Sequence, residues 1–194
     1  MQKLVFATNN KHKIHEVAPL IKSHFEILSL SDIECFEEIE EPHETLIDNA
    51  FEKARFIFKK YNLNCFADDT GLEIDALGGE PGVYSARYAG EHCSFNDNVQ
   101  KVLKKMDGRS LRTARFKTVI ALIIDGKEYS FEGSVEGEIT VAPSQGQEGF
   151  GYDPIFKPIG FNKTFAEMSL DEKNKISHRA LASKKLISFL NTIA

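Results

Sequence analysis

The sequence predicts an α/β protein with a mixed β-sheet. Apolar runs typical of strands alternate along the chain with segments in which apolar residues recur at helical spacing. Two long strand patterns, residues 114–124 and 127–142, are separated only by Asp125-Gly126, a strong hairpin signal. Because strands that alternate with helices favour parallel pairing and a hairpin requires antiparallel pairing, the sheet is expected to contain both.

The first third of the chain reads as strand, helix, strand, loop and helix. Residues 3–8 form a short apolar run that ends at Asn9-Asn10, and apolar residues at helical spacing follow it. The predicted elements are a strand at 3–8, a helix around 14–21, a strand at 25–30, an acidic loop at 34–44 and a helix around 50–58.

The middle of the chain opens with "CFADDTGLEID", residues 65–75. It reads as a strand interrupted by a turn at Asp68-Asp69-Thr70-Gly71, with strand-like alternation resuming afterwards. The remaining predicted elements are a Gly/Pro-rich loop at 78–90, a helix at 95–106, the long hairpin, a second Gly-rich loop at 146–156 and a C-terminal helix that carries Ile176 to Leu190.

Size and composition exclude several classes of protein. A chain of 194 residues suits one domain, or two lobes that share a core, and 42% hydrophobic with 27% charged residues is ordinary for a soluble protein. No apolar run approaches the roughly 20 residues that span a bilayer, and no secretory signal is visible. Cys35, Cys65 and Cys93 lack paired spacing, which argues against disulfides and zinc and favours a reducing, cytoplasmic location.

A net charge of −5 argues against general nucleic-acid binding but leaves room for a small anionic substrate at a locally basic site. One such place is "TNNKHK", where a strand turns into a helix and can present free backbone N–H groups. Lysines there oppose the helix dipole, so their presence indicates use of their charge. An ordinary solvated helix start is the alternative. The candidate residues are Thr8, Asn9, Asn10, Lys11, His12 and Lys13.

The adjacent carboxylates Asp68 and Asp69 are the second candidate. Glu40 and Glu41 lie in the acidic loop, which can fold over them. Magnesium prefers hard oxygen ligands and keeps several waters, so one or two carboxylates together with substrate phosphates suffice to hold it. A plain turn remains the competing interpretation of Asp-Asp-Thr-Gly.

Two further stretches carry polar and aromatic residues in loops or at a helix start. In "GFGYDPIF", Phe150 and Tyr152 can stack on a planar base and Asp153 can accept from ring N–H groups, or the stretch is aromatic packing in a glycine turn. In "EKNKISHRALA", Lys173, His178 and Arg179 are donors at the predicted start of the last helix. Taken together, the four stretches describe a pocket for a nucleotide polyphosphate with Mg²⁺.

These motifs, "ATNNKHKIHEV", "FADDTGLEIDALGGEPGVYSARYAG", "GFGYDPIF" and "SHRALA", resemble those of the inosine/xanthosine triphosphate pyrophosphatase family, in order and over nearly the whole chain. The resemblance implies one domain, residues 1–194, with a long mixed sheet, flanking helices and two lobes around a central active-site cleft. It also implies a homodimer that uses Mg²⁺ to hydrolyse purine nucleoside triphosphates such as ITP, dITP and XTP to the monophosphate and pyrophosphate.

The same resemblance implies a role for each matching residue. It implies that Thr8, Asn10 and Lys13 hold the triphosphate and that Thr70 touches substrate. Glu40 and Asp69 are implied to bind the metal, Asp69 to accept the proton of water, and Asp68 and Lys53 to support that site. One side of the base pocket is implied to be Phe150, Gly151, Tyr152 and Asp153, and the other side Lys173, His178 and Arg179. The chain departs from the family pattern at Asp48, where Glu is usual.

Base selection follows from hydrogen bonding. Hypoxanthine and xanthine carry an acceptor at position 6 where adenine carries a donor, so a pocket of donors from His178 and Arg179 favours them. Two other functions remain open: a related pyrophosphatase for modified pyrimidine or canonical nucleotides, and a nucleotide sensor without catalysis. The sequence does not indicate which residues reject guanine.

Overall fold

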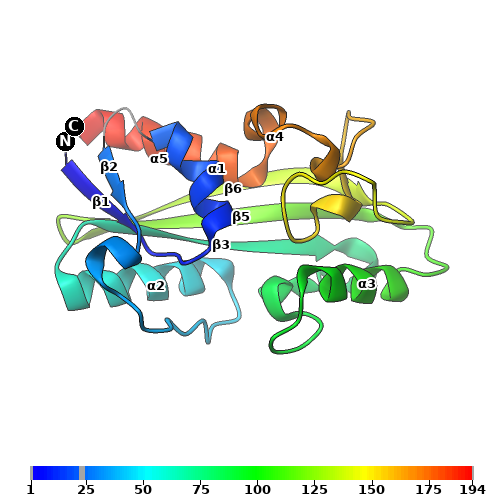
Figure 1. Cartoon of the computed structure of the whole chain (residues 1–194), viewed down its shortest axis with the longest axis horizontal. Helices are drawn as coiled ribbons and strands as arrows, with labels where there is room; N and C mark the ends of the chain where they lie inside the picture. The colour runs from blue at the N-terminus through cyan, green and yellow to red at the C-terminus, as the bar shows by residue number, and fades with distance from the viewer. Residues whose placement is uncertain (1, 22–24, 194) are drawn as a thin grey trace. The chain divides into compact units, whose positions relative to one another are not determined.

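The computed structural model describes residues 2–21 and 25–193 and confirms the predicted mixed α/β fold (Figure 1). The strands are β1 (Gln2–Phe6), β2 (Phe25–Leu28), β3 (Cys65–Ile74), β4 (Pro81–Gly82), β5 (Thr113–Ile124), β6 (Lys127–Ile139) and β7 (Phe156–Pro158). The α-helices are α1 (Lys11–Ile21), α2 (Leu46–Tyr61), α3 (Phe95–Lys105), α4 (Leu170–Ile176) and α5 (His178–Ile193). Among the helices of the described residues, none combines the length and the apolar character that crossing a bilayer requires.

The strands form one sheet with the order β2-β1-β3-β5-β6-β7, and β4 pairs with β3. Strand β1 runs parallel to both β2 and β3, whereas β4 and β7 pair antiparallel with β3 and β6. The predicted hairpin is confirmed, because β5 and β6 are neighbours joined by Asp125 and Gly126 alone. Both turn residues have positive φ, 49° and 73°, as a type I′ turn requires.

The chain divides into two compact units. Unit 1 comprises Met1–Asp69, Thr118–Gly133 and Arg179–Ala194, and unit 2 comprises Thr70–Lys117 and Ser134–His178. Each unit has its own apolar core, and each is described separately below.

In unit 1 the sheet is buried on both faces, because successive strand residues point to opposite sides. Leu4, Phe6 and Phe66 pack with α1 and α5, and the Phe6 and Phe66 rings stack with centroids 4.4 Å apart. The residues that alternate with them along the strands, such as Val5 and Ala67, pack with α2 on the other face. Figure 1 shows α1 and α5 together on one side of these strands and α2 on the other.

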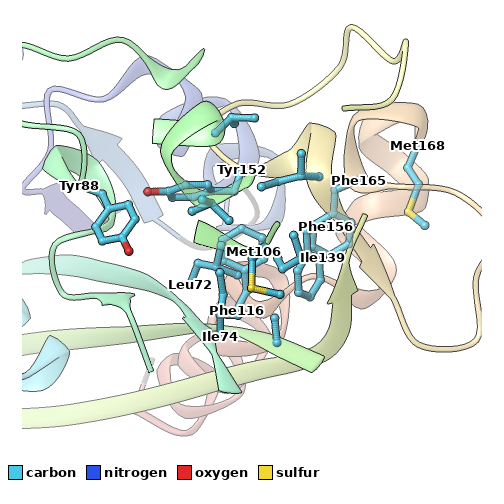
Figure 2. Packing of buried hydrophobic residues seen from close by; sticks show 14 residues of the cluster. Leu72, Ile74, Tyr88, Met106, Phe116, Ile139, Tyr152, Phe156, Phe165 and Met168 are labelled. Carbon is cyan, nitrogen blue, oxygen red and sulfur yellow. The ribbon is translucent and has the colours of Figure 1, made fainter. Parts of the chain in front are cut away.

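In unit 2 one set of alternating strand residues is apolar and the other is charged. Leu72, Ile74 and Phe116 belong to a core with α3 and the segment around Phe156 and Phe165, shown in Figure 2. The intervening residues form ion pairs at the surface, among them Arg115 with Glu73, Asp75 and Glu136.

Three predictions of local structure are wrong. Residues 65–74 form one uninterrupted strand, β3, so Asp68 to Gly71 make no turn. The C-terminal helix is two helices, α4 and α5, and Lys173 lies in α4 and not at the start of the last helix. Ser177, at φ −66° and ψ 152°, breaks the helical path between them. The two Gly-rich stretches also contain the short strands β4 and β7.

Candidate active site

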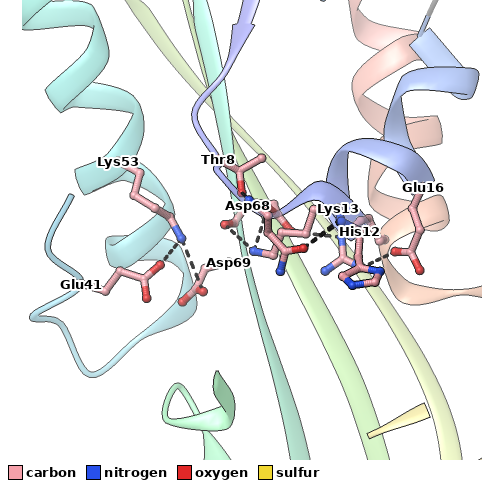
Figure 3. A network of polar contacts seen from close by, with 10 residues as sticks. Thr8, His12, Lys13, Glu16, Glu41, Lys53, Asp68 and Asp69 are labelled. Carbon is pink, nitrogen blue, oxygen red and sulfur yellow. Dashed lines mark hydrogen bonds and ion pairs between the residues drawn. The ribbon is translucent and has the colours of Figure 1, made fainter. Parts of the chain in front are cut away.

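The adjacent carboxylates Asp68 and Asp69 point to opposite faces of the sheet because they are consecutive residues of one strand. Asp68 shares its face with Phe66 and therefore with α1 and α5, whereas Asp69 shares its face with Ala67 and therefore with α2. Figure 3 shows the result: Lys13 meets Asp68, and Lys53 with Glu41 meets Asp69. Each carboxylate thus has its own lysine from its own helix.

Asp68 is fully buried and lies in a network of ion pairs. Its Oδ1 is 2.9 Å from Lys13 Nζ, and its Oδ2 is 3.1 Å from Arg179 Nε. Arg179 also donates from Nη1 to Glu16 on α1. Burial opposes ionisation of Asp68, but Lys13, Arg179 and Lys53 outweigh it and hold the pKa of this carboxyl well below its usual range. Asp68 is therefore a permanent anion.

Asp69 has the opposite electrostatics. Its Oδ1 lies 3.6 Å from Lys53 Nζ, and Lys53 also donates to the Glu41 carboxylate. Burial raises the pKa of Asp69, Lys53 opposes that rise, and the nearby Glu41 adds to it, so the net pKa is raised. For Lys53, burial is outweighed by Asp69 and Glu41, so its pKa is raised and it stays charged. Asp69 is thus the carboxylate of the pair that takes up a proton more readily.

On the other face, burial is the largest influence on Lys13. It lowers the pKa of Lys13; Asp68 opposes this, while Lys53 and Arg179 add to it. Two lysines therefore lie within one electrostatic network, and an anion that binds there would relieve their mutual repulsion.

The start of α1 differs from the expected anion site. The Asn10 Oδ1 accepts from the backbone N–H groups of His12 and Lys13, at 3.0 and 3.3 Å, and Thr8 Oγ1 accepts from the Asn10 N–H at 3.1 Å. Asn10 thus acts as an N-cap and uses two N–H groups that the prediction left for a phosphate. Asn9, Lys11 and His12 are exposed, and Lys13 reaches the Asp68 carboxylate.

The donor set at Asp69 fits a magnesium ion that keeps water and substrate ligands. Within 2–21 and 25–193, no group of three or more His, Cys, Asp or Glu side chains is arranged to hold a metal by itself. Asp69 and Glu41 supply hard carboxylate oxygens that both contact the Lys53 ammonium. Glu40, the predicted ligand, is exposed, and it is its neighbour Glu41 that contacts Lys53. The metal role of Glu40 stays a prediction.

In unit 2 a buried ion pair organises the loop at 149–153. Lys173 Nζ lies 2.7 Å from Asp153 Oδ2, and the same oxygen accepts from the Phe150 N–H at 2.7 Å. A Cβ on Gly149 would come within 2.1 Å of that oxygen, and Gly149 has φ +75°, so this position requires glycine. The Lys173 ammonium also lies 5.4 Å from the Phe150 ring centroid. Asp153 Oδ2 thus already accepts hydrogen bonds from Lys173 and from the Phe150 backbone.

His178 and Tyr152 belong to the same unit. The His178 ring is buried and stacks on Phe116 with centroids 4.5 Å apart and an interplanar angle of 13°. Tyr152 donates its hydroxyl to the Ser85 carbonyl at 2.8 Å. Gly151 has φ +63° in the connecting loop, and Thr70 is half-buried in β3. The substrate contacts predicted for these residues stay predictions.

The structure separates the predicted residues into two groups. Lys13, Lys53, Asp68, Asp69 and Arg179 share the network of unit 1, whereas the aromatic loop, Lys173 and His178 lie in unit 2. Arg179 was expected beside His178 at the base; its contacts are with carboxylates, and its base-binding role stays a prediction.

Sequence reasoning missed Glu16, although its spacing of three residues from Lys13 on one helix was a usable signal. The departure at Asp48 has a local explanation. Asp48 is exposed and accepts from the Thr45 hydroxyl at the start of α2, where its backbone N–H donates back to Thr45 Oγ1 at 3.2 Å.

The fold and this centre define an α/β protein in which buried lysines and carboxylates converge on the two faces of one strand. A family model described as the Ham1 family matches residues 4–189, and the chain belongs to that family. The resemblance seen in the motifs is therefore confirmed.

Relatives of known name are similar over nearly their full length. A protein of Flavobacterium johnsoniae named dITP/XTP pyrophosphatase is 54% identical over 188 residues, covering 97% of both chains. A protein of Christiangramia forsetii with the same name is 52% identical and covers 97% of this chain and 99% of its own. The solved structure of the Staphylococcus aureus Ham1 protein superposes with a TM-score of 0.90 at 38% identity over the whole of both chains.

Proposed function

We propose that this chain hydrolyses non-canonical purine nucleoside triphosphates, such as dITP, XTP and ITP, to the monophosphate and pyrophosphate. The observation that carries the proposal is the full-length identity of more than half with the Flavobacterium dITP/XTP pyrophosphatase. The buried pairs Lys13–Asp68 and Lys53–Asp69 support it, because hydrolysis of a phosphoanhydride depends mainly on positioning and charge neutralisation.

The lysines of unit 1 are proposed to neutralise the polyphosphate. Lys13 and Lys53 are held by carboxylates and stay in place without substrate, so little reorganisation is required when a phosphate arrives. Thr8 and Asn10 shape the chain before α1 and add polar groups beside Lys13.

Asp69 is proposed to accept the proton of the attacking water. The water oxygen bonds to the α-phosphorus, its proton passes to an Asp69 oxygen, and the bond from that phosphorus to the bridging oxygen breaks as pyrophosphate leaves. In the protein without a metal ion, burial first and Glu41 further raise the pKa of Asp69, so this carboxylate accepts a proton more readily than an exposed aspartate does. Asp68 is unsuited to this role because its pKa is depressed by its cationic neighbours.

Mg²⁺ is proposed as the cofactor, held by Asp69 with a glutamate of the acidic loop, Glu40 or Glu41. When bound, it would supply Lewis-acid stabilisation of phosphate charge. Both glutamates lie in the segment before α2, and Glu41 shares the Lys53 ammonium with Asp69.

Base recognition is proposed for unit 2. His178 and Lys173 are donors, which suits a 6-carbonyl acceptor, and the Phe150 ring offers a face for stacking. Tyr152, Gly151 and Asp153 hold the loop that carries Phe150. Arg179 is proposed to fix Asp68 through its Nε, and its base contact stays the prediction made from the sequence.

A panel of triphosphates tests the function. The purified protein is given dITP, XTP, ITP, dGTP, dATP and dUTP with Mg²⁺ or with EDTA, and the products are resolved as pyrophosphate and phosphate. We expect pyrophosphate and monophosphate from the first three nucleotides and only with Mg²⁺. Preference for dUTP or dATP would indicate the related pyrophosphatases, and binding without turnover would indicate a sensor.

The homodimer is also proposed and is tested by light scattering during gel filtration, where a mass of twice 21.8 kDa is expected. A cytoplasmic location stays a prediction from the sequence.

A further inference from the structure

The segment that carries Glu40 and Glu41 has no regular structure of its own. Residues 35–43 form neither helix nor strand, yet Glu41 contacts the Lys53 ammonium on α2, which also contacts Asp69 on β3. An irregular segment keeps a carboxylate in one place only if other groups anchor it, because each free backbone residue has about 1–2 kcal/mol of conformational entropy to lose.

Asn49 provides such an anchor. Its side chain is fully buried in the first turn of α2. The Asn49 Oδ1 accepts from the His43 N–H at 2.9 Å, and the Asn49 Nδ2 donates to the His43 carbonyl at 3.1 Å. The amide thus pairs with both main-chain groups of one residue, as a neighbouring strand would, and fixes its orientation as well as its position.

The anchor lies next to the carboxylates in two directions. Along the loop, Glu41 is two residues from His43, and two residues span at most about 7 Å. Along α2, Lys53 follows Asn49 by four residues and therefore lies on the same helix face. One amide consequently sets the spacing between the loop that carries Glu41 and the helix that carries Lys53.

We propose that Asn49 is a positioning residue that holds the acidic loop over Asp69, so that Glu41 and its neighbour Glu40 are in place for the metal. The proposal rests on the function proposed above for its catalytic consequence, but its structural part does not. The amide of Asn49 hydrogen-bonds to the His43 backbone, and Asn49 acts through that backbone.

A matched control exists on the same helix. Glu52 also contacts His43, but through the ring Nε2 at 3.4 Å, and both side chains are about two-fifths exposed. Glu52→Gln therefore changes the side-chain contact of His43 and leaves both backbone hydrogen bonds intact.

The experiment compares the wild type with Asn49→Ala, Asn49→Asp and Glu52→Gln by three measurements. Hydrogen exchange follows the His43 amide, isothermal titration follows binding of Mn²⁺ alone, and dITP turnover is measured against Mg²⁺ concentration. For Asn49→Ala we expect exchange at His43 to rise by a factor on the order of 10 or more, because the hydrogen bond from its N–H and the companion bond to its carbonyl are lost. The Kd for Mn²⁺ and the Mg²⁺ concentration that gives half-maximal turnover should each rise about 10-fold, whereas KM for dITP at saturating Mg²⁺ should change little.

Asn49→Asp keeps an acceptor for the His43 N–H and loses the donor, so its effects should be smaller than those of Asn49→Ala, and it serves as the test if the alanine variant does not fold. Glu52→Gln should match the wild type in all three measurements. The proposal is overturned if both Asn49 variants keep wild-type exchange and Mn²⁺ affinity, or if Glu52→Gln reproduces their losses. Failure of the wild type to hydrolyse dITP would contradict the proposed function instead. The hydrogen exchange of the His43 amide and the Mn²⁺ affinity would still decide the role of Asn49.

Discussion

Asp68 and Asp69 are the same residue type, adjacent in one strand, and their pKa values shift in opposite directions. Asp68 faces Lys13 and Arg179, which lower its pKa against the effect of burial, whereas burial and Glu41 together outweigh Lys53 and raise the pKa of Asp69. Strand alternation is the cause, because it presents the two carboxylates to different helices. One neighbour can therefore be structural while the other is free to take part in chemistry.

Substitution by Asn should separate these two roles. Asp69→Asn removes the proposed proton acceptor and should lower kcat for dITP by about 10²–10⁴-fold while the protein stays at least as stable. Asp68→Asn leaves Lys13 and Arg179 facing a neutral group in a buried site, which should cost about 3–5 kcal/mol of unfolding free energy. Urea unfolding and pyrophosphate release measure the two effects; equal destabilisation by both substitutions would contradict the division.

The pH dependence of stability should also differ in sign between the two residues. The pKa of Asp68 is depressed in the folded state. Its stabilising contribution to the free energy of unfolding is therefore present above the unfolded-state pKa of about 3.9 and is lost as the pH falls through the folded-state pKa. The pKa of Asp69 is raised in the folded state. Its stabilising contribution to the free energy of unfolding is therefore present below the unfolded-state pKa of about 3.9 and is lost as the pH rises through the folded-state pKa.

Unfolding between pH 3 and 8, without divalent ions, tests this. Relative to the wild type, Asp69→Asn should gain stability as pH rises, and the deficit of Asp68→Asn should shrink toward the acid end. A deficit of Asp68→Asn that stays constant with pH would show that its charge is not the origin.

At the scale of elements, strand β3 shows where sequence reasoning succeeded and failed. The apolar run 65–67 predicts the buried strand that the structure has, whereas Asp-Asp-Thr-Gly predicts a turn because those residues favour turns in isolation. Tertiary partners reverse that preference: Lys13 and Lys53 come from positions 55 and 16 residues away, and local propensity contains no information about them.

Gly71 has a different reason to be in β3. A Cβ at this position would lie 2.7 Å from the Gly82 carbonyl oxygen, on the strand β4 that pairs with β3. Glycine here therefore permits the close approach of two backbones and does not mark a turn.

Gly71→Ala should accordingly be destabilising despite the higher strand propensity of alanine. Because the clash is with backbone, which cannot move aside as a flexible side chain can, the cost should be about 1–3 kcal/mol in urea unfolding. Faster hydrogen exchange of the Leu72–Gly82 pairing region is expected with it. An unchanged urea midpoint for Gly71→Ala would mean that β4 shifts away from β3 at little energetic cost and that the two strands are not tightly packed.

On the scale of the whole molecule, the sequence was sufficient for the mixed α/β class, the hairpin and the family, since each rests on patterns that are local or recur in order along the chain. It was insufficient for the grouping of the site. Arg179 follows His178 directly in sequence, yet the two belong to different compact units with different neighbours. Adjacent residues can diverge in this way at a helix start, where the helical path sends successive side chains in different directions.

That grouping predicts which substitutions change rate and which change selectivity. Lys53 belongs to the carboxylate–lysine network, so Lys53→Met should lower kcat/KM for dITP and for dATP by the same factor, because both nucleotides carry the same triphosphate. His178 belongs to the unit proposed to recognise the base, and His178→Phe removes a donor while keeping a ring that can stack on Phe116. Loss of a hydrogen bond to the 6-carbonyl should reduce the dITP-to-dATP ratio of kcat/KM by a factor on the order of 10². The measurement is the dITP-to-dATP ratio of kcat/KM for the wild type and the two variants. If Lys53→Met altered this ratio as much as His178→Phe, base and phosphate recognition would not be divided between these residues.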